Sequence, residues 1–389
     1  MKMKGLPLCL DTYETSEIIT NKHFQAFEMP EFDRVYLPQS MRPFSDLSPL
    51  GTKEFIVDDN RGAVCTSPAV NIDGTDFFLS VKGIGSTTSP FSHQPLCKAE
   101  ICGLLNDARL KDSIINSVDV PARYITGELW LRGSPYGGQG LQHATTSMSV
   151  SEMADITSIH GFRVAPLVKT VFLPKEIEKE VKKIFWYRRF NGRIVQEIRL
   201  VPSNVRVYFH SGSTLGGNTG SIFDLFKIDD NEKALKFLKN FVRSGIAFLT
   251  LFTRSIKNNN DGTFGGLDFY DVWLDKDAVL SPDGTIYFVD LEGLEWINVR
   301  EKDVKEKIED QIFRSLYEFM FAYEQIERER SARFGDVTDR KVQLECLLSE
   351  ALKGDEIVDL VHEGENLELI IGNILQEQDL TANFPIINR

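Results

Sequence analysis

Strand-like and helix-like patterns occupy different parts of this 389-residue sequence. Short apolar runs of strand character follow one another between residues 55 and 82, and the turn pair Asp73-Gly74 separates two of them as a hairpin would. Apolar residues recur at helical spacing in residues 233–256 and again from Glu301 onward. This distribution predicts an α+β protein with a β-rich first part and a mainly helical second part.

The length of the chain suggests two or three packing units, because single cores stop growing beyond about 250–300 residues. Residues 1–50 are rich in Pro, Asp and Ser and are expected to form an irregular N-terminal arm. We expect a β-rich lobe in residues 51–132 and the rest of the core, with a helical lobe, in residues 133–300. A C-terminal helical extension should cover residues 301–389.

Charge and composition exclude several classes of function. The formal net charge of −13 argues against broad nucleic-acid binding, which needs a surplus of Lys and Arg. The five cysteines form no C-x-x-C pair and no zinc-like pattern with the six histidines. No run approaches the roughly 20 apolar residues that span a bilayer, and the N-terminal run is too short for an export signal. We therefore expect a cytoplasmic protein without a membrane partner.

A strand that ends in a lysine suggests a phosphate site. The stretch FFLSVKGIGSTTS, residues 77–89, places Lys82 at the end of an alternating apolar run and follows it with glycines and hydroxyls. The ammonium of Lys82 is a point charge, and Gly83 and Gly85 allow backbone N–H groups to approach an anion. A solvated lysine at the mouth of a hairpin is the alternative interpretation.

An acidic hairpin is the second candidate feature. Residues 271–296 read as two strands joined by a tight turn at Asp283-Gly284. Asp277 precedes the first strand and Asp290 follows the second, so the hairpin would bring two carboxylates together. Such oxygens are the ligands that Mg²⁺ prefers, and a carboxylate buried at a strand end needs a partner or a metal. A solvated hairpin with capping acids remains the alternative.

In combination, these pieces resemble the protein-kinase-like fold in its divergent forms. The stretch VKGIGSTTSPFS is similar to the lysine loop of the selenoprotein O family, which reads K-G-A-G-x-T-P-Y-S. The run RLVPSNVRVYF, with Arg199 and Arg206, resembles that family's R-V-A-P-S-F-x-R-F, and VPARYITGE resembles its I-P-T-T-R-A segment. The resemblance extends over residues 75–295 in the family's order and implies a two-lobed kinase-like fold, with a β-rich N-lobe and a mainly helical C-lobe.

The resemblance also implies a function. The family binds ATP in an inverted pose and transfers AMP to a protein hydroxyl. By that similarity Lys82, Arg199 and Arg206 would hold the phosphates, and Glu100 would pair with Lys82. Taken alone, Glu100 is the simpler case of a first-turn acid favoured by the helix dipole. Asp290, in the sequence DLEG, would correspond to the metal aspartate of the family's D-Y-G element and would bind Mg²⁺ or Mn²⁺.

The sequence departs from the family where the catalytic stretch N-T-D-N is expected. WLDKDAVL stands there instead, so Asp277 would replace the metal-binding asparagine, and the general base would be Asp275 or Asp271. The longer turn before Asp290 is similar to small-molecule kinases of the aminoglycoside type. Three functions are therefore expected alternatives: AMP transfer from ATP, phosphoryl transfer to a protein or small molecule, and nucleotide binding by a catalytically inactive pseudokinase scaffold.

Overall fold

The protein is described by a computed structural model, which covers residues 7–26, 28–38, 47–59, 62–84, 139–153, 161–184, 193–207, 221–269, 272, 274, 277–291 and 293–335. The predicted roles of Gly85, Glu100, Asp271 and Asp275 lie outside these residues. The described part combines helices with a large antiparallel sheet, which confirms the prediction of mixed α and β content. The predicted domain boundaries stay predictions.

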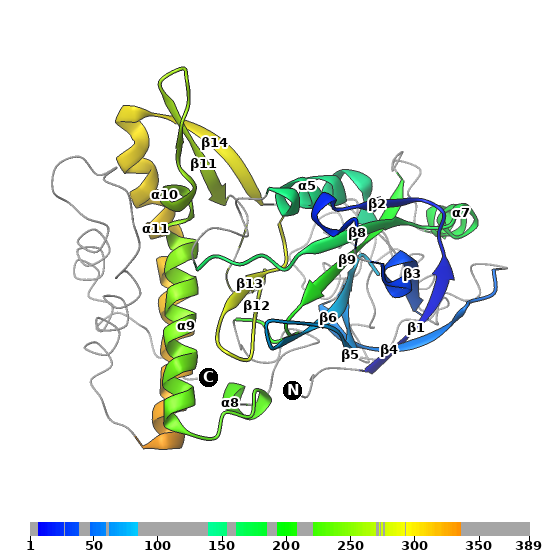
Figure 1. Cartoon of the computed structure of the whole chain (residues 1–389), viewed down its shortest axis with the longest axis horizontal. Coiled ribbons are helices and arrows are strands. Elements are labelled where there is room, and N and C mark those ends of the chain that lie inside the picture. The colour runs from blue at the N-terminus through cyan, green and yellow to red at the C-terminus, as the bar shows by residue number, and fades with distance from the viewer. Residues whose placement is uncertain are drawn as a thin grey trace, which may run out of the picture.

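The described residues form a nine-stranded antiparallel sheet, seen on the right of Figure 1. Its neighbours run in the order β2-β8-β9-β6-β5-β4-β1-β3, and β7 pairs with β9 beyond the end of β6. The strands are β1 (Pro7–Glu14), β2 (Ile18–Thr20), β3 (Arg34–Pro38), β4 (Gly51–Asp59), β5 (Gly62–Ile72), β6 (Thr75–Lys82), β7 (Gln139–Gly140), β8 (Leu167–Phe172) and β9 (Ile194–Val201). The predicted hairpin strands before Lys82 are thus confirmed as β5 and β6.

The prediction of an irregular N-terminal arm is wrong for much of its length, because β1, β2 and β3 all join the large sheet. Buried polar residues hide the strand character of β1 in the sequence. Asp11 is fully buried and accepts a hydrogen bond from Oγ1 of Thr52 on β4, with an O···O distance of 2.9 Å. Because that partner lies 41 residues away, no local pattern reveals the strand.

The sheet curls so that its edge strand β3 returns toward β9. The backbone N–H of Tyr36 donates to Oε1 of Gln196 at 2.9 Å, and Nε2 of Gln196 donates to the Tyr36 carbonyl at 2.6 Å. In the same region, Lys169 on β8 forms an ion pair with Asp33, which directly precedes β3. These contacts cover part of the edge of β3, which would otherwise be open to pairing with another chain.

The helices and two smaller sheets complete the fold (Figure 1). The helices α5 (Leu141–Glu152) and α7 (Lys175–Ile184) lie beside the large sheet. The helical part contains α8 (Ile222–Leu225), α9 (Asn231–Leu249), α10 (Leu251–Ser255) and α11 (Val304–Phe334). The described residues also include the short 3₁₀ helices η1 (Lys22–Phe24), η2 (Pro30–Asp33) and η6 (Glu301–Asp303). The smaller sheets are β10 (Lys257–Asn258), β11 (Thr263–Phe269) and β14 (Leu294–Arg300), and the hairpin of β12 (Ala278–Leu280) and β13 (Ile286–Phe288).

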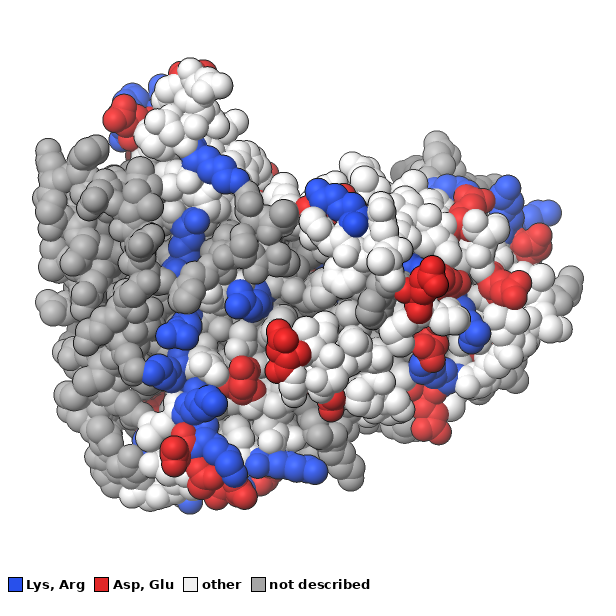
Figure 2. Space-filling model, in the orientation of Figure 1, with Lys and Arg blue, Asp and Glu red and all other residues white. Residues whose placement is uncertain are grey.

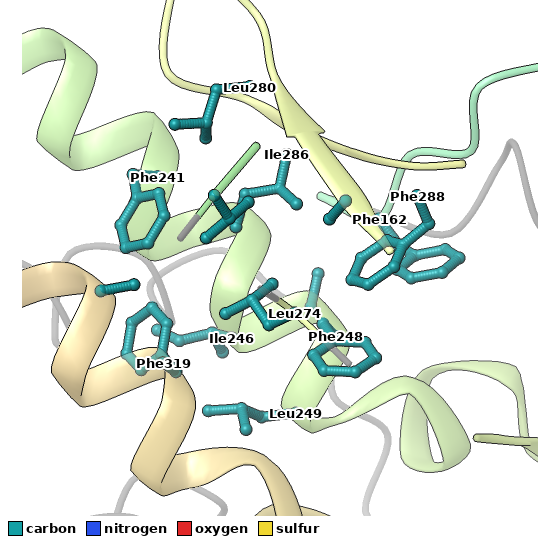
Figure 3. Packing of buried hydrophobic residues seen from close by; sticks show 14 of the residues in the cluster. Phe162, Phe241, Ile246, Phe248, Leu249, Leu274, Leu280, Ile286, Phe288 and Phe319 are labelled. Atoms are coloured by element: carbon teal, nitrogen blue, oxygen red, sulfur yellow. The ribbon is translucent and has the colours of Figure 1, made fainter. Parts of the chain in front are cut away.

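The β12–β13 hairpin packs on α9, in the core drawn in Figure 3. The rings of Phe248 on α9 and Phe288 on β13 lie 4.5 Å apart between centroids, and Phe241 stacks on Phe319 of α11 at 5.7 Å. At the tip of the hairpin, Nδ2 of Asn240 donates to the carbonyl of Asp283 at 2.9 Å. The helical core therefore holds the hairpin at both its root and its turn.

Basic side chains gather over the helical part on the face seen in Figure 2. Figure 2 shows a column of Lys and Arg side chains over α9, although the whole chain carries a net charge of −13. Lys233 and Lys236 lie on the exposed side of α9, while Ala234, Phe237 and Leu238 are buried. The helix is therefore amphipathic. None of the helices in the described residues is long and apolar enough to cross a membrane.

Candidate functional site

Lys82 on β6 meets Asp290, two residues beyond β13, where the large sheet adjoins the hairpin. Nζ of Lys82 donates to Oδ1 of Asp290 at a distance of 2.9 Å. The side chains are 14% and 25% exposed, so the attraction is less screened than in a pair on the open surface. Two of the predicted site residues, 208 positions apart in the sequence, thus belong to one site.

The end of β6 explains why Lys82 faces the hairpin. Alternation along the strand places Leu79 and Val81 on one face, inside the apolar core of the large sheet. Ser80 and Lys82 point to the opposite face. After the strand, Gly83 has φ of +95°, a conformation that residues with a side chain rarely adopt, so the chain turns away directly after Lys82.

The predicted approach of the two hairpin aspartates is confirmed for their backbones. The N–H groups of Val289 and Asp290 donate to the carbonyl of Asp277, with N···O distances of 2.8 and 3.4 Å. Asp277 is only 3% exposed. Since the predicted turn at Asp283-Gly284 also forms, the hairpin brings its two ends together as the sequence indicated.

Backbone hydrogen bonds fix this hairpin against the segments that flank the large sheet. Ala165, just before β8, donates to the carbonyl of Phe288 at 2.8 Å, and Leu280 donates to that of Val205 at 2.7 Å. Arg206 lies in the segment after β9 and forms a β-bridge with Val279. Asp290 is therefore held relative to Lys82 by main-chain contacts on both strands of the hairpin.

Arg199, which the resemblance assigns to the phosphates, is buried and paired with a carboxylate. It is 1% exposed and forms an ion pair with Glu197 two residues earlier on β9, with Nε 2.8 Å from Oε2 and Nη2 donating to the same oxygen. A buried charge needs such a partner. Glu197 was not among the predicted site residues, although a glutamate and an arginine within the otherwise mostly apolar run RIVQEIRLV signal a buried pair.

Burial near the site raises the pKa of one phenol, that of Tyr287. The ring of Tyr287 on β13 contacts that of Phe77 on β6 edge to face, with centroids 5.7 Å apart. Desolvation raises the pKa of Tyr287, and the nearby Asp283 carboxylate adds to the rise. At neutral pH this side chain therefore contributes packing between the sheet and the hairpin, and no negative charge.

The residues present fit a divalent cation in their chemistry. Asp277 and Asp290 supply carboxylate oxygens, the hard ligands that Mg²⁺ and Mn²⁺ prefer. Within the described residues no three His, Cys, Asp or Glu side chains gather closely enough to hold a metal by themselves. Mg²⁺ usually takes one or two protein carboxylates and completes its shell with water and phosphate oxygens, so two aspartates meet that requirement.

Comparisons with known proteins add no relative to this picture. No family model, no curated protein and no solved structure matches the chain. The function must therefore be inferred from the contacts among Lys82, Asp277 and Asp290, and from the resemblance of the sequence motifs.

Proposed function

We propose that the chain is an ATP- and metal-dependent transferase with a kinase-like core, which transfers AMP to a protein hydroxyl. The observation that carries this proposal is the 2.9 Å contact between Lys82 and Asp290. A lysine that ends a sheet strand and an aspartate that follows a hairpin are the two charges that a nucleotide phosphate and its metal require. The resemblance to the selenoprotein O family selects AMP as the transferred group.

Each residue has a distinct task in this proposal. Lys82 binds a phosphate oxygen through its ammonium, while Asp277 and Asp290 hold Mg²⁺ or Mn²⁺. A bound divalent cation would neutralise charge on the phosphates during transfer. The protein's part is mostly positioning and charge stabilisation, so few residue types suffice. Asp275 and Asp271 remain the candidates for the general base.

The positions of Arg199 and Arg206 support a role near the phosphates in different ways. Arg206 lies in the segment that pairs with β12, so its backbone is fixed beside the hairpin. Arg199 lies on the same sheet face as Lys82, opposite Ser80 in the strand register. Its guanidinium is already engaged by Glu197, which favours a supporting position under the phosphates over a flexible surface contact.

Phosphoryl transfer is the second candidate function, and the hairpin favours it. The turn between β12 and β13 is anchored to α9 and separates Asp277 from Asp290 by a longer segment than the resemblance to selenoprotein O implies. This length is similar to that in small-molecule kinases. A catalytically inactive pseudokinase scaffold is the third candidate, favoured by the direct neutralisation of Asp290 by Lys82.

Calorimetric titration of the purified chain with ATP, in the presence of Mg²⁺ or Mn²⁺, tests the proposal at the binding step. We expect saturable binding that Lys82→Met weakens at least about tenfold, because one charge-assisted contact to phosphate is lost. Lys169→Met is the matched control, since Lys169 is also a buried strand lysine paired with a carboxylate, but on β8 and with Asp33. Absence of ATP binding by the wild-type chain would exclude all three candidates.

A further inference from the structure

Glu197 is the side chain that flanks Lys82 within the sheet. In the strand register, Lys82 lies opposite Gly62 on β5 and opposite Glu197 on β9. Directly opposed residues of antiparallel strands point to the same face, with Cβ atoms about 4.5–5.5 Å apart. Because Gly62 has no side chain, Glu197 alone lies beside the stem of Lys82 among its two cross-strand partners.

Glu197 also keeps one carboxylate oxygen without a hydrogen bond. Its Oε2 accepts from Arg199, whereas Oε1 is buried and has no partner. Within the described residues, Nη1 of Arg199 and Oγ1 of Thr170 are buried and unsatisfied as well, and Thr170 lies opposite Glu197 on β8. Buried polar atoms without a partner are rare, and three at neighbouring positions indicate that this place is built to accept a further group.

Helix α5 packs on the face of the sheet that carries Glu197. Ala144 packs with Phe172 and Val195 on this face of the sheet, and Oγ of Ser151 accepts from the N–H of Leu167. Ser147 lies between these two contacts on the helix, and its buried hydroxyl also has no partner. The residues over Glu197 are therefore small or neutral, and no described residue of α5 except Glu152, at its far end, carries a negative charge.

We propose that Glu197 is a second carboxylate partner of Lys82, which positions the ammonium when Asp290 binds another ligand. In the described arrangement Nζ of Lys82 pairs with Asp290. Rotation of the lysine stem toward β9 brings the ammonium to Oε1 of Glu197, which is the unoccupied acceptor. A strand residue thereby fixes the lysine, in addition to or in place of Glu100, the partner that the resemblance implies. This role rests on the proposed function, since it supposes that Asp290 leaves Lys82 for a metal.

The energetic reason lies in the buried charges. In the described arrangement Lys82 pairs with Asp290, and Arg199 pairs with Glu197. When Asp290 turns to a cation, Lys82 would lose this ion pair in a partly buried place, which is costly. Glu197 supplies a negative charge within reach, and Arg199 holds its carboxylate in orientation through Oε2.

A double-mutant cycle in urea denaturation tests this pairing without any nucleotide. Lys82→Met and Glu197→Gln are made singly and together, in the wild-type chain and in Asp290→Asn. On the Asp290→Asn background we expect the double variant to shift the denaturation midpoint by clearly less than the sum of the single shifts, because both remove one shared contact. With Asp290 present, the single shifts should nearly add. Additive shifts on both backgrounds would overturn the proposal.

The Glu197→Gln variant leaves Arg199 with an uncompensated buried charge, so a second variant is prepared for the case that Glu197→Gln does not fold. The pair Glu197→Gln/Arg199→Met, which removes both buried charges, then replaces it as one unit in the same cycle. The expected and contradicting results are the same as before.

Mg·ATP binding by calorimetry supplies a readout that a purely structural role of Glu197 would not produce. Lys82→Met and Glu197→Gln should each weaken binding about tenfold, and the double variant should be no weaker than Lys82→Met alone. Losses that multiply in the double variant would overturn the positioning role. If the wild-type chain binds no ATP while the denaturation cycle shows coupling, the proposed function fails and the pairing of Lys82 with Glu197 stands.

Discussion

Lys82 and Asp290 form an ion pair that joins the last residue of β6 to the segment after β13, with Nζ and Oδ1 2.9 Å apart. Val289 beside Asp290 packs with Val64 and Phe78 of the large sheet, so the ion pair lies at the edge of a small apolar contact. A cation that binds Asp290 must therefore compete with the ammonium of Lys82.

This competition predicts that Lys82→Met binds Mn²⁺ more tightly than the wild-type chain in the absence of nucleotide. Removing the ammonium leaves Asp277 and Asp290 without that competing positive charge, which favours a divalent cation. Titration of Mn²⁺ followed by electron paramagnetic resonance measures the affinity, and Lys169→Met should leave it unchanged. Equal or weaker Mn²⁺ binding by Lys82→Met would contradict a metal site at these aspartates.

The hairpin turn predicts a strong effect of a single methyl group. Gly284 has φ of +94°, and a Cβ there would lie 2.1 Å from the carbonyl oxygen of Phe237 on α9. Gly284→Ala should lower the free energy of unfolding by about 3 kcal/mol or more, through backbone strain and a clash that only a shift of the hairpin relieves. Gly74→Ala is the matched control, because Gly74 has φ of +82° with open space around it.

Gly74→Ala should lower the free energy of unfolding by only about 1 kcal/mol, the cost of the conformation itself. Urea denaturation of both variants separates the two contributions. Equal losses in the two variants would show that the tip of the hairpin does not pack against α9.

A buried ion pair in α11 predicts a large loss of stability. Glu327 and Arg330 are fully buried, with Nη2 of Arg330 donating to Oε1 at 2.7 Å and Nε donating to Oε2 at 2.7 Å. Glu327→Ala leaves the guanidinium without its counter-charge and should lower the free energy of unfolding by about 3–5 kcal/mol. Asp229→Ala, which breaks the exposed pair with Lys233, should leave it nearly unchanged. Thermal and urea denaturation measure both variants. Similar losses of stability in Glu327→Ala and Asp229→Ala would argue against burial of the Glu327–Arg330 pair.

The burial of Tyr36 on β3 predicts that the stability of the fold depends on pH in the alkaline range. Burial raises the pKa of Tyr36 well above its ordinary value of 10.0, and the phenol donates to the carbonyl of Glu31 at 2.7 Å. The unfolded chain therefore loses this proton first. The associated stability is complete below about pH 10 and declines as the pH rises from there toward the pKa of the folded state.

Tyr36→Phe removes this titration and one hydrogen bond. The variant should be less stable at neutral pH by about 1 kcal/mol, yet its stability should fall less steeply above pH 10. Urea denaturation between pH 8 and 11 measures both slopes. The same slope in both proteins would show that Tyr36 ionises equally easily in the folded and unfolded chain.

The sequence predicted elements whose signals are local. The pair Asp283-Gly284 identified the turn that brings Asp277 to Asp290, and the alternation before Lys82 identified β6. Helical spacing in residues 233–256 and after Glu301 identified α9 and α11. In each case the residues that specify the element are adjacent or one turn apart, so the pattern is visible without tertiary contacts.

The contacts of distant segments were not visible in this way. The strand β1 depends on Asp11 finding Thr52, and the edge of β3 depends on Gln196. For Glu197 the run RIVQEIRLV signals a buried charge pair, but its position beside Lys82 comes from the register between β6 and β9. The sequence placed Lys82 and Asp290 in one site, but their direct contact depends on how the hairpin docks on the sheet.

The most direct test of the central claim is incubation of the purified chain with Mg²⁺ or Mn²⁺ and ATP labelled at the α or γ phosphate. Asp290→Asn is compared with Asp283→Asn, a substitution at the turn of the same hairpin. We predict incorporation from α-labelled ATP alone, lost in Asp290→Asn and kept in Asp283→Asn. Label from the γ phosphate alone would contradict AMP transfer in favour of a kinase, and no label from either position despite ATP binding would contradict catalysis.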